Sequence, residues 1–140
     1  MKTTIAALVG LLLVRTIFAS SAAAPSDNFP CPVPRGFISV ALRSALPAPL
    51  QKMFEHAAMP GENFNTTDNG IPGEGLLFVW NKGNLWIVAS GHGGIAFFLA
   101  VQVFQIAGDG KSASDITPRS DTNLSVPCPL ATRYAQSLAQ

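Results

Sequence analysis

Two cysteines lie far apart in this chain, and each stands between two prolines, in the stretches FPCPVP and VPCPLA. Proline fixes φ and biases the preceding residue toward extended backbone, so both cysteines are expected on stiff, non-helical segments. Two distant cysteines in an exported chain usually form a disulfide, and closing a loop of about 100 residues contributes up to ~4.7 kcal/mol in the chain-entropy model. We therefore predict a bridge between Cys31 and Cys128. A reactive or metal-binding pair is the alternative, but the chain has no C-x-x-C spacing.

The first 24 residues have the order of a secretory signal peptide. Lys2 supplies a positive start, an apolar run follows from Ile5 to Val14, and small residues extend to Ala24. We expect this segment to be removed on export, to the periplasm or out of the cell. Residues 25–140 then remain as the mature chain, which is long enough for one domain and too short for two.

The charge balance of the mature chain excludes two kinds of partner. Removal of Lys2 and Arg15 reduces the nine basic residues to seven, against eight acidic ones, so the formal net charge changes from +1 to −1. A near-neutral chain without basic runs has no electrostatic basis for binding nucleic acid or anionic lipid. Its longest apolar run, Ile95–Val101, is much shorter than the ~20 residues of a membrane span, and we expect it in the core.

Apolar periodicity predicts two helices. The first begins at Pro47 and Pro49, which suit an initial helical turn, and it ends at Met59-Pro60-Gly61. Its apolar face comprises Leu46, Leu50, Met53, Phe54 and Ala57. The second follows Pro129, with Leu130, Tyr134 and Leu138 recurring every fourth residue. The stretch GFISVALRSAL fits either a short helix or a strand.

Two runs rich in β-branched and aromatic residues, Leu76–Trp80 and Leu85–Ser90, predict a hairpin. We expect a three-residue loop at Asn81–Gly83, with Gly83 in the left-handed region. That register places Trp80 opposite Asn84 and Phe78 opposite Trp86, so Phe78, Trp80 and Trp86 would share one face. The other face would also be apolar, so each side of the hairpin needs a cover.

Further strands are expected at Leu99–Ala107 and, more weakly, at Ser114–Thr117. Together these elements predict an α+β fold. We expect a small single domain with a three- to four-stranded antiparallel sheet, helices packed on one face, and one disulfide.

His92 is the residue whose chemistry is most open. It lies in SGHGG, which we expect to connect the second and third strands. The interpretation that requires no chemistry is that His92 is a turn or packing residue. A catalytic role would use Ser90 as nucleophile and a carboxylate such as Asp68 or Asp109. However, VASGH is not the G-x-S-x-G elbow of the α/β-hydrolases. The scattered carboxylates and two histidines predict no metal site, and no motif implies a cofactor.

A binding role would use the aromatic hairpin. Trp80, Trp86 and His92 are the expected ligand-binding residues, although the two indoles could equally be core. The polar, glycine-rich stretch from Glu62 to Gly75 predicts a long loop beside them, and such loops are either mobile or functional.

The stretch FVWNKGNLWIVASGHGG, residues 78–94, resembles a core found in uncharacterised small exported proteins of proteobacteria. The shared pattern is W-N-x-G-x-x-W-x-V-A-x-x-H-G-G, beginning at Trp80. This resemblance implies a bacterial periplasmic or secreted setting. It implies no activity, cofactor or catalytic residue.

These observations lead to three functional hypotheses. The first is a non-enzymatic binding or inhibitory module that engages an envelope or extracellular protein, or a small ligand, through the aromatic hairpin and the adjacent loop. The second is a small hydrolase that uses His92, Ser90 and a carboxylate. The third is a structural component of the envelope.

Overall fold

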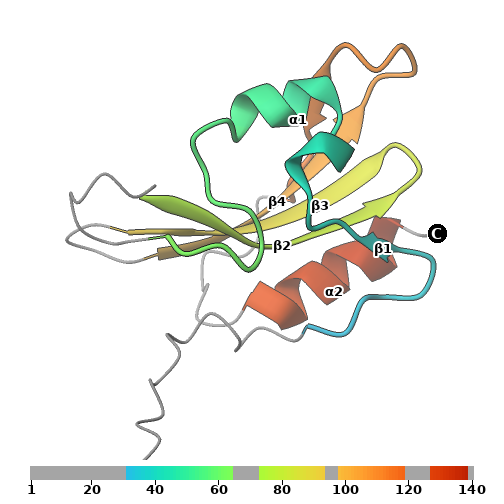
Figure 1. Cartoon of the computed structure of the whole chain (residues 1–140). Coiled ribbons are helices and arrows are strands. Elements are labelled where there is room, and N and C mark those ends of the chain that lie inside the picture. Colours follow the sequence, from blue (N-terminus) through green and yellow to red (C-terminus); the bar gives the residue numbers. More distant parts are fainter. Residues whose placement is uncertain (1–30, 65–72, 94–97, 119–126, 139–140) are drawn as a thin grey trace, which may run out of the picture.

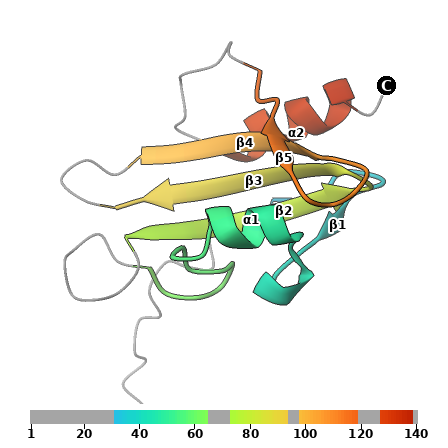
Figure 2. The ribbon, with the colours of Figure 1, turned by 90° about the horizontal axis from the view of Figure 1, so that it is seen from above.

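A computed structural model of the chain describes residues 31–64, 73–93, 98–118 and 127–138. The predicted signal peptide and the stretch 65–72 of the predicted loop lie outside the described residues. Five antiparallel strands form one sheet in sequence order (Figures 1 and 2). They are β1 (Ile38–Ser39), β2 (Glu74–Lys82), β3 (Leu85–His92), β4 (Phe98–Ile106) and β5 (Ala113–Asp115). The α-helices are α1 (Ala48–Met53) and α2 (Pro127–Leu138), and within the described ranges neither is long and apolar enough to cross a bilayer.

The predicted α+β class and the disulfide are confirmed, but the sheet has five strands rather than three or four. The additional strand is β1, and it comes from the stretch that fitted either a helix or a strand. The structure uses that stretch for both, because β1 is followed by one turn of 3₁₀-helix at Arg43–Ala45. β4 and β5 lie within two residues of their predicted bounds.

The helices cover opposite faces of the sheet, so the prediction that both pack on one face is wrong (Figure 1). The α2-side core consists of Cys31, Phe37, Phe78, Trp80, Ile87, Ala89, Val101, Val103, Leu130, Ala131, Tyr134 and Ala135. The α1-side core consists of Val40, Leu46, Leu50, Phe54, Ala57, Met59, Leu76, Val79, Trp86, Val88, Phe104 and Ile106. The physical reason is that the central strands are apolar on both faces, and each face requires its own cover.

The predicted hairpin register is also wrong. Lys82 lies opposite Leu85, so the loop is the two residues Gly83 and Asn84 rather than three. Gly83 has a φ of +60°, whereas Asn84 does not have a positive φ. Positive φ at only the first of the two central residues is typical of a type II′ turn, whose twist matches that of the flanking strands. Trp80 consequently lies opposite Ile87, three residues further along the chain than the predicted partner Asn84.

An odd shift of register moves every side chain of one strand to the other face relative to its partner. Trp80 therefore packs in the α2-side core and Trp86 in the α1-side core. Phe78 stacks on Trp80, with ring centroids 4.4 Å apart, and the predicted pair of Phe78 with Trp86 does not form. The two indoles are core residues on opposite sides of one sheet.

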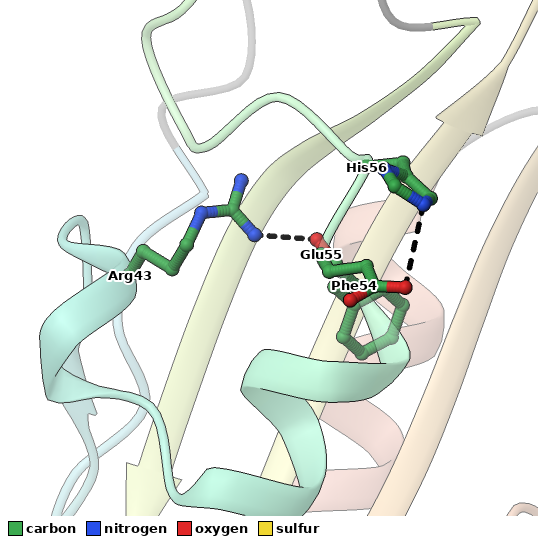
Figure 3. A network of polar contacts seen from close by, with 4 residues as sticks. All are labelled: Arg43, Phe54, Glu55 and His56. Carbon is green, nitrogen blue, oxygen red and sulfur yellow. Dashed lines mark hydrogen bonds and ion pairs between the residues drawn. The ribbon is translucent and has the colours of Figure 1, made fainter.

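Helix α1 ends at Met53, before the predicted stop near Met59. The Arg43 guanidinium donates a hydrogen bond to the carbonyl oxygen of Phe54 (Figure 3). It also donates to the carbonyl oxygen of Ala57, so a side chain satisfies backbone groups beyond the end of the helix. The next residue, Ala58, then pairs with the outer edge of β2: its N–H donates to Glu74 and its carbonyl accepts from Leu76. Pairing with the sheet edge thus replaces the last turns of the predicted helix.

Helix α2 matches the prediction, and the disulfide joins Cys31 to its first turn with a Cα–Cα distance of 5.4 Å. Cys128 is helical rather than on an extended segment, because a proline is readily accommodated in an initial helical turn, and Pro127 and Pro129 both lie there. The bridge therefore holds both the start of the described chain and α2 against the same face of the sheet.

Replacement of Trp80 by alanine should lower the free energy of unfolding by about 3–5 kcal/mol, because its side chain is 1% exposed in the α2-side core. Urea denaturation of the disulfide-bonded protein measures this. Ile38→Ala is the control, since Ile38 is 61% exposed and should cost less than about 0.5 kcal/mol. A loss below about 1 kcal/mol for Trp80→Ala would contradict its assignment to the core.

Candidate functional site

The candidate site lies at the end of the sheet where β2 begins, β3 ends and β4 begins. His92 lies opposite Glu74 on β2 and opposite Phe98 on β4, so these three side chains form a row across the sheet. Ser90, two residues before His92 on β3, points to the same face. We name Glu74, Ser90, His92 and Phe98 the strand-end cluster.

The contacts in the strand-end cluster converge on the imidazole. Ser90 Oγ lies 3.2 Å from His92 Nε2, and Glu74 Oε1 lies 3.3 Å from the same nitrogen. The ring of Phe98 stacks on the imidazole with centroids 4.5 Å apart and an interplanar angle of 8°. The ring orientation of His92 is therefore held from two sides, by polar contacts at Nε2 and by stacking across its face.

This arrangement differs from that of a catalytic triad. A triad histidine contacts the nucleophile through one ring nitrogen and the orienting acid through the other. Here Ser90 and Glu74 share Nε2. When Nε2 carries a proton, it can donate to Glu74 or to Ser90; when it is bare, it can only accept from the Ser90 hydroxyl. The carboxylate thus competes with the serine for one atom.

Exposure divides the strand-end cluster into a buried and an open part. Ser90 has no exposed surface, so its hydroxyl cannot meet a substrate in this conformation. The side chains of His92 and Glu74 are 29% and 30% exposed, and Phe98 is 54% exposed. What faces solvent is an aromatic ring and a carboxylate, while the only hydroxyl of the cluster lies beneath them.

Two backbone features hold the end of β2 in place. The N–H of Gly93 donates to the carbonyl of Gly73 at 2.7 Å, which extends the pairing of β3 with β2 beyond His92. The ring of Phe64 packs directly against Gly75, where an added Cβ would lie 2.0 Å from Phe64 Cδ1. Gly75 therefore leaves room for the Phe64 ring to pack against β2 next to Glu74.

The predicted site residues do not all meet. Ser90 and His92 are brought together, as a catalytic role would require. His92 is the last residue of β3 rather than part of the connecting loop. Trp80 and Trp86 are buried on opposite faces, so they form no common surface with His92.

The carboxylate that the structure places at His92 is that of Glu74, which was not among the predicted ones. Asp68 lies outside the described residues, and Asp109 lies in the turn after β4, at the other end of that strand, where it accepts from the N–H of Lys111. Glu74 and Phe98 were missed because only the correct register and the bulge between Leu76 and Phe78 place Glu74 opposite His92. Strand pairing was the only signal that could have identified them.

A second polar group lies after α1, where His56 Nε2 approaches Glu55 Oε1 at 3.3 Å (Figure 3). The two residues are sequence neighbours and the His56 side chain is 94% exposed, so this is a solvated surface pair. In the described ranges, no three residues among the histidines, cysteines and acids are grouped to hold a metal ion. The disulfide uses both cysteines.

Comparison with models of known protein families gives no match for this chain. Comparisons with curated proteins and with solved structures also give none.

Substitution of Gly75 by alanine should destabilise the protein by about 1–3 kcal/mol, because the new methyl group would overlap the ring of Phe64. Chemical denaturation of Gly75→Ala, Phe64→Ala and the double variant measures the coupling of the two positions. Removal of the ring should make the alanine tolerable, so the double variant should lose less stability than the sum of the single variants. Simple additivity would show that the two residues do not pack together.

Proposed function

We propose that this chain is a non-enzymatic binding module, and that it engages a partner protein through the strand-end cluster. The observation that carries the proposal is the exposed ring of Phe98, stacked on His92 beside the Glu74 carboxylate, with the serine hydroxyl buried beneath. A rigid aromatic side chain with a polar group next to it is typical of the anchors that dominate protein interfaces.

The chemistry of the open part favours a cationic or planar group on the partner. One face of the Phe98 ring stacks on His92, and the residue is 54% exposed to solvent. A guanidinium stacks well on such a ring, and a nearby carboxylate such as that of Glu74 adds electrostatic attraction. We therefore propose that an arginine of the partner docks on Phe98.

The buried indoles move the proposed surface away from the aromatic hairpin. Both tryptophans serve the two cores, so neither can anchor a partner without unfolding. His92 remains from the predicted ligand-binding residues. We propose the bacterial periplasm or the cell exterior as the setting, which is compatible with the Cys31–Cys128 disulfide.

Replacement of Phe98 by alanine should weaken partner binding by about 2 kcal/mol or more, because an exposed anchor contributes to binding and little to stability. Partners are captured from envelope and culture-supernatant extracts, identified, and titrated against wild type and Phe98→Ala. Glu74→Gln should also lower the affinity for the same partner, because it removes the negative charge of the carboxylate.

Met53→Ala is the matched control, since Met53 is also a large exposed apolar residue but lies on α1. Its affinity should remain within about 0.5 kcal/mol of wild type. If Phe98→Ala and Glu74→Gln, both folded by thermal melt, keep the wild-type affinity for every captured partner, the proposed surface is wrong.

A small serine hydrolase is the second candidate, and the 3.2 Å contact between Ser90 Oγ and His92 Nε2 is the observation that favours it. Two observations weigh against it: Ser90 is fully buried, and Glu74 lies at the nitrogen that a catalytic base would use for the serine. The binding proposal requires neither group to react.

A fluorophosphonate probe, which labels activated serines covalently, separates the two candidates. We expect no labelling of the purified protein, because the probe cannot reach a hydroxyl with no exposed surface. The measurement is intact-mass spectrometry after incubation. Labelling of wild type that disappears in Ser90→Ala would establish Ser90 as a nucleophile and would replace the binding proposal by the hydrolase.

A further inference from the structure

The outer edge of β4 is paired along only part of its length (Figure 2). β5 pairs with β4 from Phe104 to Ile106. Before that, the Val103 carbonyl accepts from the N–H of Ile116, and the Val103 N–H donates to Thr117 Oγ1. Val103 therefore directs both of its backbone groups outward, away from β3.

Alternate residues of a strand direct their backbone groups to the same side. Because the pairing of β3 with β4 is regular from Leu85 to His92, Leu99 and Val101 must point outward as Val103 does. No described residue hydrogen-bonds to the outward groups of Leu99 and Val101. Both side chains are apolar and buried, so only the backbone N–H and C=O groups of these two residues are available for pairing.

Among the described residues, this part of β4 also has none of the features that protect a sheet edge. Folded proteins guard such edges with charged residues, proline, bulges or a covering segment. The sequence from Phe98 to Gln102, FLAVQ, contains no charge and no proline, and its pairing with β3 has no bulge. The other edge of the sheet differs, because β1 and Ala58 cover most of β2.

We propose that a second copy of this chain pairs with this edge, so that two β4 strands join antiparallel about Ala100. This register sets Leu99 opposite Val101 of the other copy, and each such pair exchanges both of its N–H···O=C bonds. It uses both outward residues and leaves Val103 bonded to Ile116 and Thr117. The segment is uncharged, so two copies meet without repulsion.

The small side chain of Ala100 lies on the two-fold axis, where it faces its own counterpart. An isologous interface of this kind requires a self-complementary segment, which FLAVQ provides through the symmetric placement of Leu99 and Val101 around Ala100. The proposal goes beyond the proposed function, because it uses the backbone groups of Leu99 and Val101 and not the side chains of the strand-end cluster, although Phe98 lies next to them and would face Gln102 of the other copy.

Sedimentation velocity of the mature, disulfide-bonded chain over a range of concentrations tests the proposal. Wild type should dimerise, and Ala100→Lys should weaken dimerisation by about tenfold or more, because two like charges then face each other on the axis. Gln105→Lys is the matched control: it adds the same charge to an exposed position of β4 that β5 already pairs, and it should dimerise as wild type does.

An equimolar mixture of Ala100→Lys and Ala100→Glu provides the decisive comparison. Opposite charges on the axis should restore dimers in the mixture, while each variant alone stays weakened. A thermal melt of each variant confirms folding. A wild type that stays monomeric at about 1 mM, or an Ala100→Lys variant that associates as wild type does, overturns the proposal.

Amide hydrogen exchange supplies a second readout. The amides of Leu99 and Val101 should exchange more slowly as the wild-type concentration rises. Protection that is complete and independent of concentration would show that the edge is already covered within one chain, and it would also overturn the proposal.

Discussion

The two-residue turn at Gly83 and Asn84 determines which residues meet in the strand-end cluster. Gly83 adopts positive φ there at no steric cost, and the turn sets Lys82 opposite Leu85. That pairing decides the face of every residue on β2 and β3. Together with the bulge after Leu76, it also brings Glu74 opposite His92 at the far end of the hairpin.

A second constraint follows from the apolar character of β2 and β3 on both faces. A sheet of this kind cannot leave either face in water, so the short α1 and the chain after it cover one side and α2 covers the other. The disulfide strengthens the second cover, because it ties α2 to the segment before Phe37. Trp80 and Trp86 each serve one of the two cores.

The strand-end cluster lies where these covers end. Ser90 is the last fully buried residue on its face of β3, and His92, two residues further, is partly open. Along β3, burial thus decreases from Ser90, whose hydroxyl is hidden, to His92, whose imidazole is partly exposed. Stacking on His92 holds the exposed Phe98 ring in a fixed orientation, as the proposed binding role requires.

Local chemistry in the sequence was sufficient for the disulfide, the helix after Pro129 and the strands on either side of Gly83, because each depends on neighbouring residues or on compartment. Ser90 and His92 share a strand face because β3 continues to His92, which was predicted to lie in a connecting loop. The strand-end cluster itself could not be predicted from the sequence, because Glu74 and Phe98 meet His92 only when β2 and β4 pair with β3. Register is a tertiary property that depends on a single turn and a single bulge, and a hairpin apolar on both faces gives no alternation from which to read it.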